Sequence, residues 1–313
     1  MPAQCHVEAM SASSDLPHPF DRRALRARRE RAAGARNRNF LLDRIAEDLP
    51  ERLSTVKRRF SFALDLATPG DALIRALVAG GQVERILAFE PLAALRDPAL
   101  ALRVGGDEEL LPFGSESFDL VVSALALQWV NDLPGTLVQI RRALKPDGLL
   151  LAALLGGETL TELRQTLALA EVEIEGGVSP RVAPFIEVRT MGSLLQRAGF
   201  ALPVTDIDRL TVRYTNLGAL FRDLRAMGAT NILAERRRKP LRRATLARAD
   251  AIYAERFADA DGRLRATFDL LWISAWAPHE SQQQALKPGS AKVRLADALG
   301  TTERPAGEKA GRR

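Results

Sequence analysis

Residues 105–155 constrain the fold of this chain more than any other part, because signals for strands, a helix and turns follow one another there without a gap. Residues 118–124 are an apolar run after a turn rich in Gly, Ser and Glu, which predicts a strand buried on both faces of a parallel sheet. The Asn-Asp pair at 131–132 can cap a helix whose apolar positions recur every three or four residues. The Lys-Pro-Asp-Gly sequence at 145–148 should end that helix in a turn, and residues 149–155 predict the next buried strand.

The rest of the chain continues this alternation of strands and helices. Further strands are predicted at residues 62–66, 85–89, 100–104, 205–214 and 268–275. Further helices are predicted at residues 71–79, 158–173, 190–198, 217–227 and 245–257. Strands that alternate with helices indicate an α/β protein built around a mostly parallel sheet.

Composition and spacing suggest four segments. We expect a disordered leader at 1–19, basic N-terminal helices at 20–58, a main domain at 59–277 with a helical insertion at about 217–260, and a flexible tail at 278–313. The basic segment carries a dense run of arginines at positions 22, 23, 26, 28, 29 and 31 and then an apolar helical face at positions 40, 41, 45 and 49. Two interpretations stay open for it: a solvated helix packed on the core by its apolar half, or a lid over the ligand-binding end of the sheet.

Composition also argues against several classes of protein. No apolar run approaches the roughly 20 residues that a membrane-spanning helix needs, and the first residues lack the basic start and apolar centre of a secretory signal. The single cysteine, Cys5, rules out an intrachain disulfide. The histidines, His6, His18 and His279, show no spacing typical of a metal site, so no metal is expected. The net charge of +6 allows an acidic partner but points to no clear nucleic-acid partner.

The runs LPF, SFDLVVS, LQWVNDLP and LKPDGLLL within 105–155 resemble the second half of the core of class I S-adenosylmethionine (SAM)-dependent methyltransferases of type 11. This resemblance implies a doubly wound, mostly parallel seven-stranded sheet of Rossmann-like topology, here with an N-terminal helical extension and a helical insertion. It also implies SAM as the cofactor.

The family places an acidic residue and a glycine-rich turn after its first strand, and the matching segment here begins at Asp65. Asp65 would orient the methionine ammonium. Ala67 and Pro69 stand at the first two glycine positions, and Gly70 remains nearby. Since proline lacks a donor and a Cβ narrows the approach, SAM binding at this loop is weakened, altered or lost, unless the Pro-Gly pair still supplies the turn.

Other cofactor contacts follow from later strand ends. Glu90 ends the second predicted strand, where a carboxylate can accept hydrogen bonds from both ribose hydroxyls, although a surface carboxylate is the alternative. By resemblance, Asp107 with its neighbour Glu108 contacts the adenine amino group. Ser123 and the Gln128-Trp129 pair would line the methyl donor and the substrate, although Trp129 also suits a core position.

Several runs outside the core carry a narrower resemblance: FDRRALRARRERAA at 20–33, GGETLTELRQTL at 156–167, VSPRVAPF at 178–185, LGALFRDLRAMGATN at 217–231 and WAPHESQQQALKPGSA at 276–291. They are similar to the methyltransferase-fold assembly factor of respiratory complex I, whose eukaryotic member is mitochondrial and is associated with arginine hydroxylation on a complex I subunit. The resemblance implies a protein substrate and, for a bacterial relative, a cytoplasmic location beside the inner membrane.

Two other functions stay open. One is a malonyl carrier-protein O-methyltransferase with a similar core, and the other is a non-catalytic assembly chaperone whose SAM site is degenerate. The weak candidates for catalytic residues are Glu158, Gln128 and Trp129. The charge of Glu158 could equally stabilise the start of a helix. Further polar candidates for holding a protein substrate lie in the family-like runs at Arg164, Arg181, Arg222, Arg225 and Asn231.

Overall fold

The structure is a computed structural model that describes residues 18–34, 39–92, 97–283, 290 and 293–302. The chain divides into two compact units, Met1–Pro278 and His279–Arg313. The second unit contains the short helix α9, Leu295–Ala298. The predicted leader at 1–19 lies almost wholly outside the described residues, as do Cys5 and His6.

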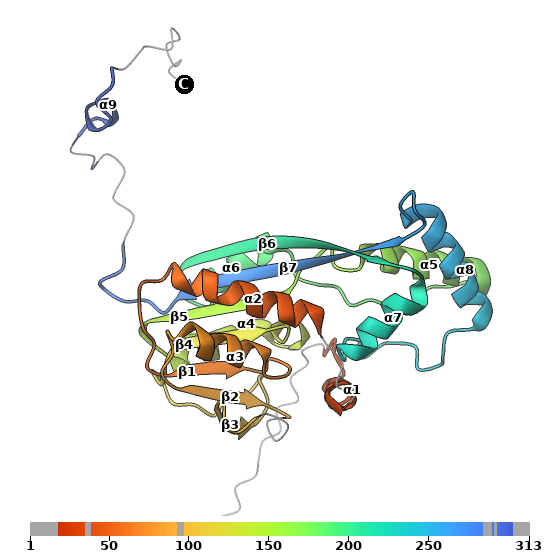
Figure 1. Cartoon of the computed structure of the whole chain (residues 1–313), viewed down its shortest axis with the longest axis horizontal. Coiled ribbons are helices and arrows are strands. Elements are labelled where there is room, and N and C mark those ends of the chain that lie inside the picture. Colours follow the sequence, from red (N-terminus) through yellow and green to blue (C-terminus); the bar gives the residue numbers. More distant parts are fainter. Residues whose placement is uncertain (1–17, 35–38, 93–96, 284–289, 291–292, 303–313) are drawn as a thin grey trace, which may run out of the picture. The chain divides into compact units, whose positions relative to one another are not determined.

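The first unit is built on one seven-stranded sheet with the strand order β3-β2-β1-β4-β5-β7-β6 (Figure 1). The strands are β1 Ala63–Leu66, β2 Ile86–Glu90, β3 Leu102–Gly105, β4 Phe118–Ala124, β5 Leu144–Leu155, β6 Ala201–Tyr214 and β7 Leu264–Trp276. Neighbouring strands from β3 to β5 are parallel, whereas β7 runs antiparallel to both β5 and β6. This confirms the predicted seven-stranded, mostly parallel, doubly wound sheet.

Helices cover both faces of the sheet. Side chains of β4 enter two separate apolar clusters: Leu120 and Val122 pack on one face, and Val121 packs on the other. Phe118 joins Val121, because the register of β4 shifts between Phe118 and Leu120. The first face is covered by α2 Phe40–Ser54 and α3 Ala72–Gly80, and the second by α4 Leu133–Ala143 and α6 Val188–Arg197. Strands buried on both faces require continuous apolar runs, which is why 118–124 and 149–155 were recognisable in the sequence.

The antiparallel pair β6 and β7 is longer than the rest of the sheet. Only Leu270–Trp276 of β7 pairs with β5, while β6 follows β7 from Leu264 to Trp276. The part of the pair beyond β5 packs with α5 Thr161–Glu175, α7 Leu217–Ala226 and α8 Arg243–Phe257 (Figure 1). The last two helices lie between β6 and β7 in sequence, where the helical insertion was expected.

The prediction that residues 145–148 form a turn between the helix and the next strand is wrong. β5 already begins at Leu144, which pairs with Phe118, and the next regular pair is Leu120 with Leu149. The intervening residues form a bulge in which Asp147, not Gly148, has a positive φ of 59°. Gly148 is needed for space, because a Cβ there would lie 2.8 Å from the Lys145 carbonyl oxygen.

The basic N-terminal segment forms two helices. α1 spans Arg22–Gly34 and carries the arginines, while α2 carries the predicted apolar face. The Asn39 side chain accepts a hydrogen bond from Leu42 N at 3.2 Å and so caps α2. Leu41, Ile45 and Leu49 are buried against α3 and the sheet.

Candidate functional site

The topological switch point of the sheet lies between β1 and β4, because the chain extends the sheet in opposite directions from these two strands. Ligands of open α/β sheets bind at the carboxyl ends of the strands beside such a point. Three buried side chains lie there: Asp65 near the end of β1, Glu90 at the end of β2 and Ser123 near the end of β4. The Ser123 hydroxyl donates to the Leu66 carbonyl at 2.8 Å, so this side chain ties β4 to β1.

The loop after β1 keeps a tight turn although its glycines are missing. Ala67 has a φ of 56°, in the left-handed region that glycine adopts most easily, and Gly70 has a φ of 78°. Two hydrogen bonds fix the loop: Ala67 N donates to the Phe89 carbonyl at 2.8 Å, and Ala124 N donates to Thr68 Oγ1 at 3.0 Å. Ala67 therefore carries backbone strain on the order of 1–2 kcal/mol that a glycine would not carry.

A second acidic segment follows β3. A Cβ added to Gly106 would overlap the ring of Phe89, so glycine is required for the chain to pass this ring. The turn brings Asp107 and Glu108 to the same end of the sheet as Glu90, whose carbonyl accepts from Gly106 N at 3.3 Å. Glu108 is fully buried, while the Asp107 side chain is about one third exposed.

Arginines of α1 contact this acidic segment. Arg22 Nη2 lies 2.5 Å from Glu108 Oε1 and 3.1 Å from Asp107 Oδ1, and Arg26 also pairs with Asp107. Burial alone would lower the pKa of Arg22, but the charges of Glu108 and Asp107 outweigh it and raise the pKa above the usual value. Arg22 Nη1 also donates to the Trp129 carbonyl at 3.0 Å, which links α1 to the end of β4.

Arg29 covers the switch point itself. Its guanidinium donates to the Leu125 carbonyl at 2.9 Å and to the Ala67 carbonyl at 3.4 Å, the residues that follow β4 and β1. A cavity of about 10 Å³ lies between α1 and Glu90, whereas a pocket for a drug-sized ligand needs roughly 300 Å³ or more. α1 therefore lies over this end of the sheet, as the predicted lid would, and the space it leaves beside Glu90 is too small for a large ligand.

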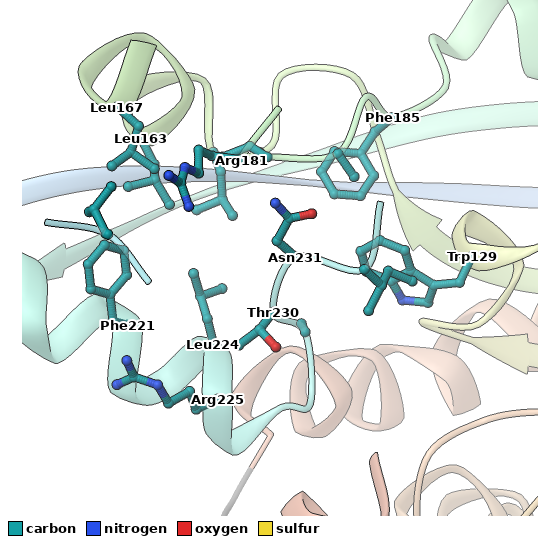
Figure 2. A pocket seen from close by; sticks show the side chains of 16 residues that line it. Trp129, Leu163, Leu167, Arg181, Phe185, Phe221, Leu224, Arg225, Thr230 and Asn231 are labelled. Carbon is teal, nitrogen blue, oxygen red and sulfur yellow. The ribbon is translucent and has the colours of Figure 1, made fainter. Parts of the chain in front are cut away.

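A larger cavity of about 280 Å³ begins at Trp129 and extends between α5 and α7 (Figure 2). Most of its wall is apolar. We call it the Trp129 pocket; it is lined by Trp129, Leu160, Leu163, Leu167, Arg181, Val182, Ala183, Phe185, Phe221, Leu224, Arg225, Ala229, Thr230, Asn231, Ile232 and Leu241. The indole of Trp129 is packed edge-on against Phe20 and Phe185, with ring centroids 5.6 and 5.8 Å away. These two rings hold the indole in place as part of the pocket wall.

Buried polar contacts hold the segment that forms the roof of the Trp129 pocket. The Glu171 carboxylate accepts from Ser179 N and Oγ, both at 2.7 Å, and from Arg181 Nε at 2.9 Å. Burial acts to raise the pKa of Glu171, but the hydrogen bonds from Ser179 and Arg181 outweigh it and hold the pKa below its usual value. Asn231 Nδ2 donates to the Pro180 carbonyl at 2.7 Å and closes the pocket from the other side.

The structure brings some of the predicted site residues together and leaves others apart. Asp65, Ala67, Glu90, Asp107, Glu108 and Ser123 lie at one end of the sheet, and Gly70 lies in the loop after β1. Gln128 is buried beside Pro69, and its Oε1 atom has no hydrogen-bond partner among the described residues. Glu158 is exposed before α5 and does not line the Trp129 pocket.

Sequence reasoning missed Thr68, which fixes the loop after β1, and the apolar wall of the Trp129 pocket. Most of that wall comes from α5, α7 and the segments beside them, of which the sequence predicted only the two helices. Arg164, one of the polar candidates, donates to the Thr159 and Ala183 carbonyls and does not line the pocket. The described part of the chain contains no group of three or more His, Cys, Asp or Glu residues placed to hold a metal ion, and none of its helices combines the length and apolarity of a membrane span.

The strand order and the switch-point geometry are those of a class I methyltransferase fold. A match to the family described as "Methyltransferase domain" covers residues 65–152. The solved structure of YcgJ from Bacillus subtilis has the same fold, with a TM-score of 0.51 at 14% identity over 74% of this chain and 99% of its own.

Two groups of relatives match most of the chain. The mitochondrial arginine-hydroxylase NDUFAF5 of Danio rerio is 40% identical over 286 residues, which is 89% of this chain and 88% of that protein. The malonyl-[acyl-carrier protein] O-methyltransferase of Laribacter hongkongensis is 37% identical over 286 residues, which is 86% of this chain and 94% of that protein. This chain belongs to the branch of the SAM-dependent methyltransferase family that includes both of these enzymes.

Proposed function

We propose that this chain is a SAM-binding enzyme that modifies a protein substrate during the assembly of respiratory complex I. The modification is methylation or, by similarity to the arginine-hydroxylase relatives, hydroxylation of an arginine. Such a role places the protein in the bacterial cytoplasm, beside the inner membrane where complex I is assembled. The observation that carries the proposal is the row of buried carboxylates at the switch point, next to the Trp129 pocket. The similarity of the whole chain to the arginine-hydroxylase relatives supports the same conclusion.

The residues at the switch point suit the chemistry of SAM. An ammonium group, ribose hydroxyls and an adenine amino group all need acceptors, and this end of the sheet offers carboxylates. Asp65 would hold the ammonium, Glu90 the ribose hydroxyls, and Asp107 with Glu108 the adenine edge. The buried, unpartnered Oε1 of Gln128 supports a polar ligand beside the loop after β1.

When bound, SAM supplies an electrophilic methyl group on its sulfonium. The chain's own contribution to methyl transfer is then positioning and exclusion of water, because the apolar wall of the Trp129 pocket can hold the acceptor next to the switch point. Trp129 joins the two sites: its carbonyl is bound by Arg22 of the lid, and its ring forms a wall of the pocket. A closed lid would keep water from the reacting atoms.

Calorimetric titration with SAM and S-adenosylhomocysteine tests the cofactor site. Glu90→Ala should weaken binding by about 10- to 100-fold, because two hydrogen bonds to a carboxylate are lost. Glu84→Ala is the matched control: Glu84 is exposed and precedes β2, at the opposite end of that strand. If the folded wild-type protein binds neither compound, the chain is a non-catalytic assembly chaperone with a degenerate site.

One feature of the Trp129 pocket favours a second candidate, methylation of a malonyl group on a carrier protein. Arg225 lines the pocket and is exposed, whereas the charge of Arg181 is already paired with Glu171, and no carboxylate is present among the described residues that line the pocket. An acceptor with a free carboxylate suits this wall better than a guanidinium does. Incubation with SAM and either malonyl carrier protein or the complex I subunits, followed by mass spectrometry, would assign an added methyl group to one acceptor. Hydroxylation needs O2 and a reductant, which SAM does not supply, so its test is an oxygen atom missing from a complex I subunit of a deletion strain.

A further inference from the structure

A wide groove with several arginines lies between α1 and α7, on the side of α1 that faces away from the switch point. It has a volume of about 680 Å³ and is lined by Arg28, Arg31, Ala32, Arg222, Arg225, Ala226, Thr230 and Asn231. We call it the arginine groove. Arg31, Arg222 and Arg225 are exposed, and no carboxylate is present among the described residues that line the groove.

Helical spacing places the arginines of α1 on two different faces of the helix. Arg22, Arg26 and Arg29 share one face and contact the carboxylates and carbonyls at the switch point. Arg28 and Arg31 point to the other side and line the arginine groove. Arg28 is fixed there by donating to the Thr230 carbonyl at 3.0 Å and to the Asn231 carbonyl. The positive charge of the groove is therefore built by two helices and held in place by the chain between α7 and α8.

The arginine groove adjoins the Trp129 pocket, since Arg225, Thr230 and Asn231 line both. A single ligand can therefore place negative charges in the groove and an apolar group in the pocket. We propose that the arginine groove binds an acidic segment of a protein partner, and that an apolar side chain of this segment enters the Trp129 pocket. The proposal rests on the proposed function, in which the substrate is a protein.

The positive charge of the arginine groove favours an anionic ligand, and the apolar wall of the Trp129 pocket favours a peptide over a nucleic acid. Bases bind proteins by stacking on exposed aromatic faces. The indole of Trp129, which is 6% exposed, is packed against Phe20 and Phe185, and leucines supply much of the remaining wall. Such a wall fits an aliphatic or phenyl side chain of a peptide.

The test is fluorescence anisotropy with a short labelled peptide that alternates glutamate and leucine, measured on the full chain without SAM. Binding should weaken as salt is added. The double variant Arg31→Glu, Arg222→Glu should weaken it by about 10- to 25-fold, from roughly threefold to fivefold per exposed ion pair. Neither residue lines the Trp129 pocket or contacts the switch point. A peptide with alanine in place of leucine should also bind more weakly, because it leaves the pocket unfilled.

The matched control is Arg189→Glu, Arg197→Glu, which makes the same change of charge at exposed positions of α6 and should alter binding by less than about twofold. Equal losses in both double variants would mean that only total charge matters and would overturn the proposal. So would the absence of peptide binding, or tighter binding of single-stranded oligouridine than of the peptide. A parallel titration with SAM keeps the tests separate: its failure overturns the proposed function, whereas a charge-reversed groove should leave SAM binding unchanged.

Discussion

Replacing Ala67 by glycine tests whether the loop after β1 stores backbone strain. Ala67 is fully buried with a φ of 56°. A left-handed conformation costs a non-glycine residue about 1–2 kcal/mol, which Ala67→Gly recovers. The same change loses a buried methyl group, about 0.8 kcal/mol, and adds unfolded-state entropy worth roughly 0.4–1 kcal/mol. The terms nearly cancel, so we expect the free energy of unfolding to stay within about 0.5 kcal/mol of the wild type.

The matched control is Ala88→Gly, because Ala88 is also fully buried but lies in the extended strand β2. It has no left-handed strain to release, so it should lower the free energy of unfolding by about 1–2 kcal/mol. Urea unfolding followed by tryptophan fluorescence measures both variants against the wild type. If Ala67→Gly destabilises the protein as much as Ala88→Gly does, the loop carries no strain and the reasoning fails.

Three further predictions concern the lid, the loop and the pocket roof. Arg29→Ala removes the guanidinium that holds α1 over the switch point, so stopped-flow association of SAM should become about 10-fold faster; an unchanged or slower rate would show that α1 is not a barrier. Thr68→Val leaves the buried Ala124 N without this acceptor, and urea unfolding should show a loss of about 1–3 kcal/mol, with a loss under 0.5 kcal/mol arguing against it. Glu171→Gln should lower the free energy of unfolding by about 2–3 kcal/mol at neutral pH. Because the folded-state pKa of Glu171 lies below its ordinary value of 4.5, the wild-type advantage is complete above pH 4.5 and shrinks as the pH falls through the folded pKa; a constant difference down to acidic pH would contradict this.

The sheet could be predicted from the sequence because its strands are buried on both faces and therefore appear as short apolar runs. The boundary at 145–148 was misjudged since Pro and Gly usually end a helix in a turn, whereas here β5 contains a bulge at Asp147. The strand β7 is longer than predicted at both ends: it spans Leu264–Trp276, while its apolar run suggested 268–275. Residues 264–267 pair with β6 beyond the edge of β5, where one face of the sheet no longer needs to be apolar.

The candidate cofactor residues could also be predicted, because a carboxylate directly after a parallel strand must lie at the ligand-binding end of the sheet. Asp65 and Glu90 are of this kind. The Trp129 pocket could not be found in this way. Its walls come from segments between 129 and 241 that lie far apart in the sequence, and no local pattern records that they meet. The polar candidates Arg181, Arg225 and Asn231 all line this pocket, whose apolar wall was not foreseen, and their role in holding a protein substrate stays a prediction.

α1 connects the two halves of the proposed site. One face of this helix holds the lid closed through Arg22 and Arg29, and another supplies Arg28 and Arg31 to the arginine groove. A rigid helix cannot leave the switch point without displacing one wall of the groove as well. If α1 takes a different position when SAM is bound, then SAM and an acidic segment each change the affinity for the other, and thermodynamic linkage requires the two factors to be equal. The dense arginines of α1 then have two functions: one face contacts the switch point, and the other binds the acidic segment. The total charge of the chain could not separate these two functions.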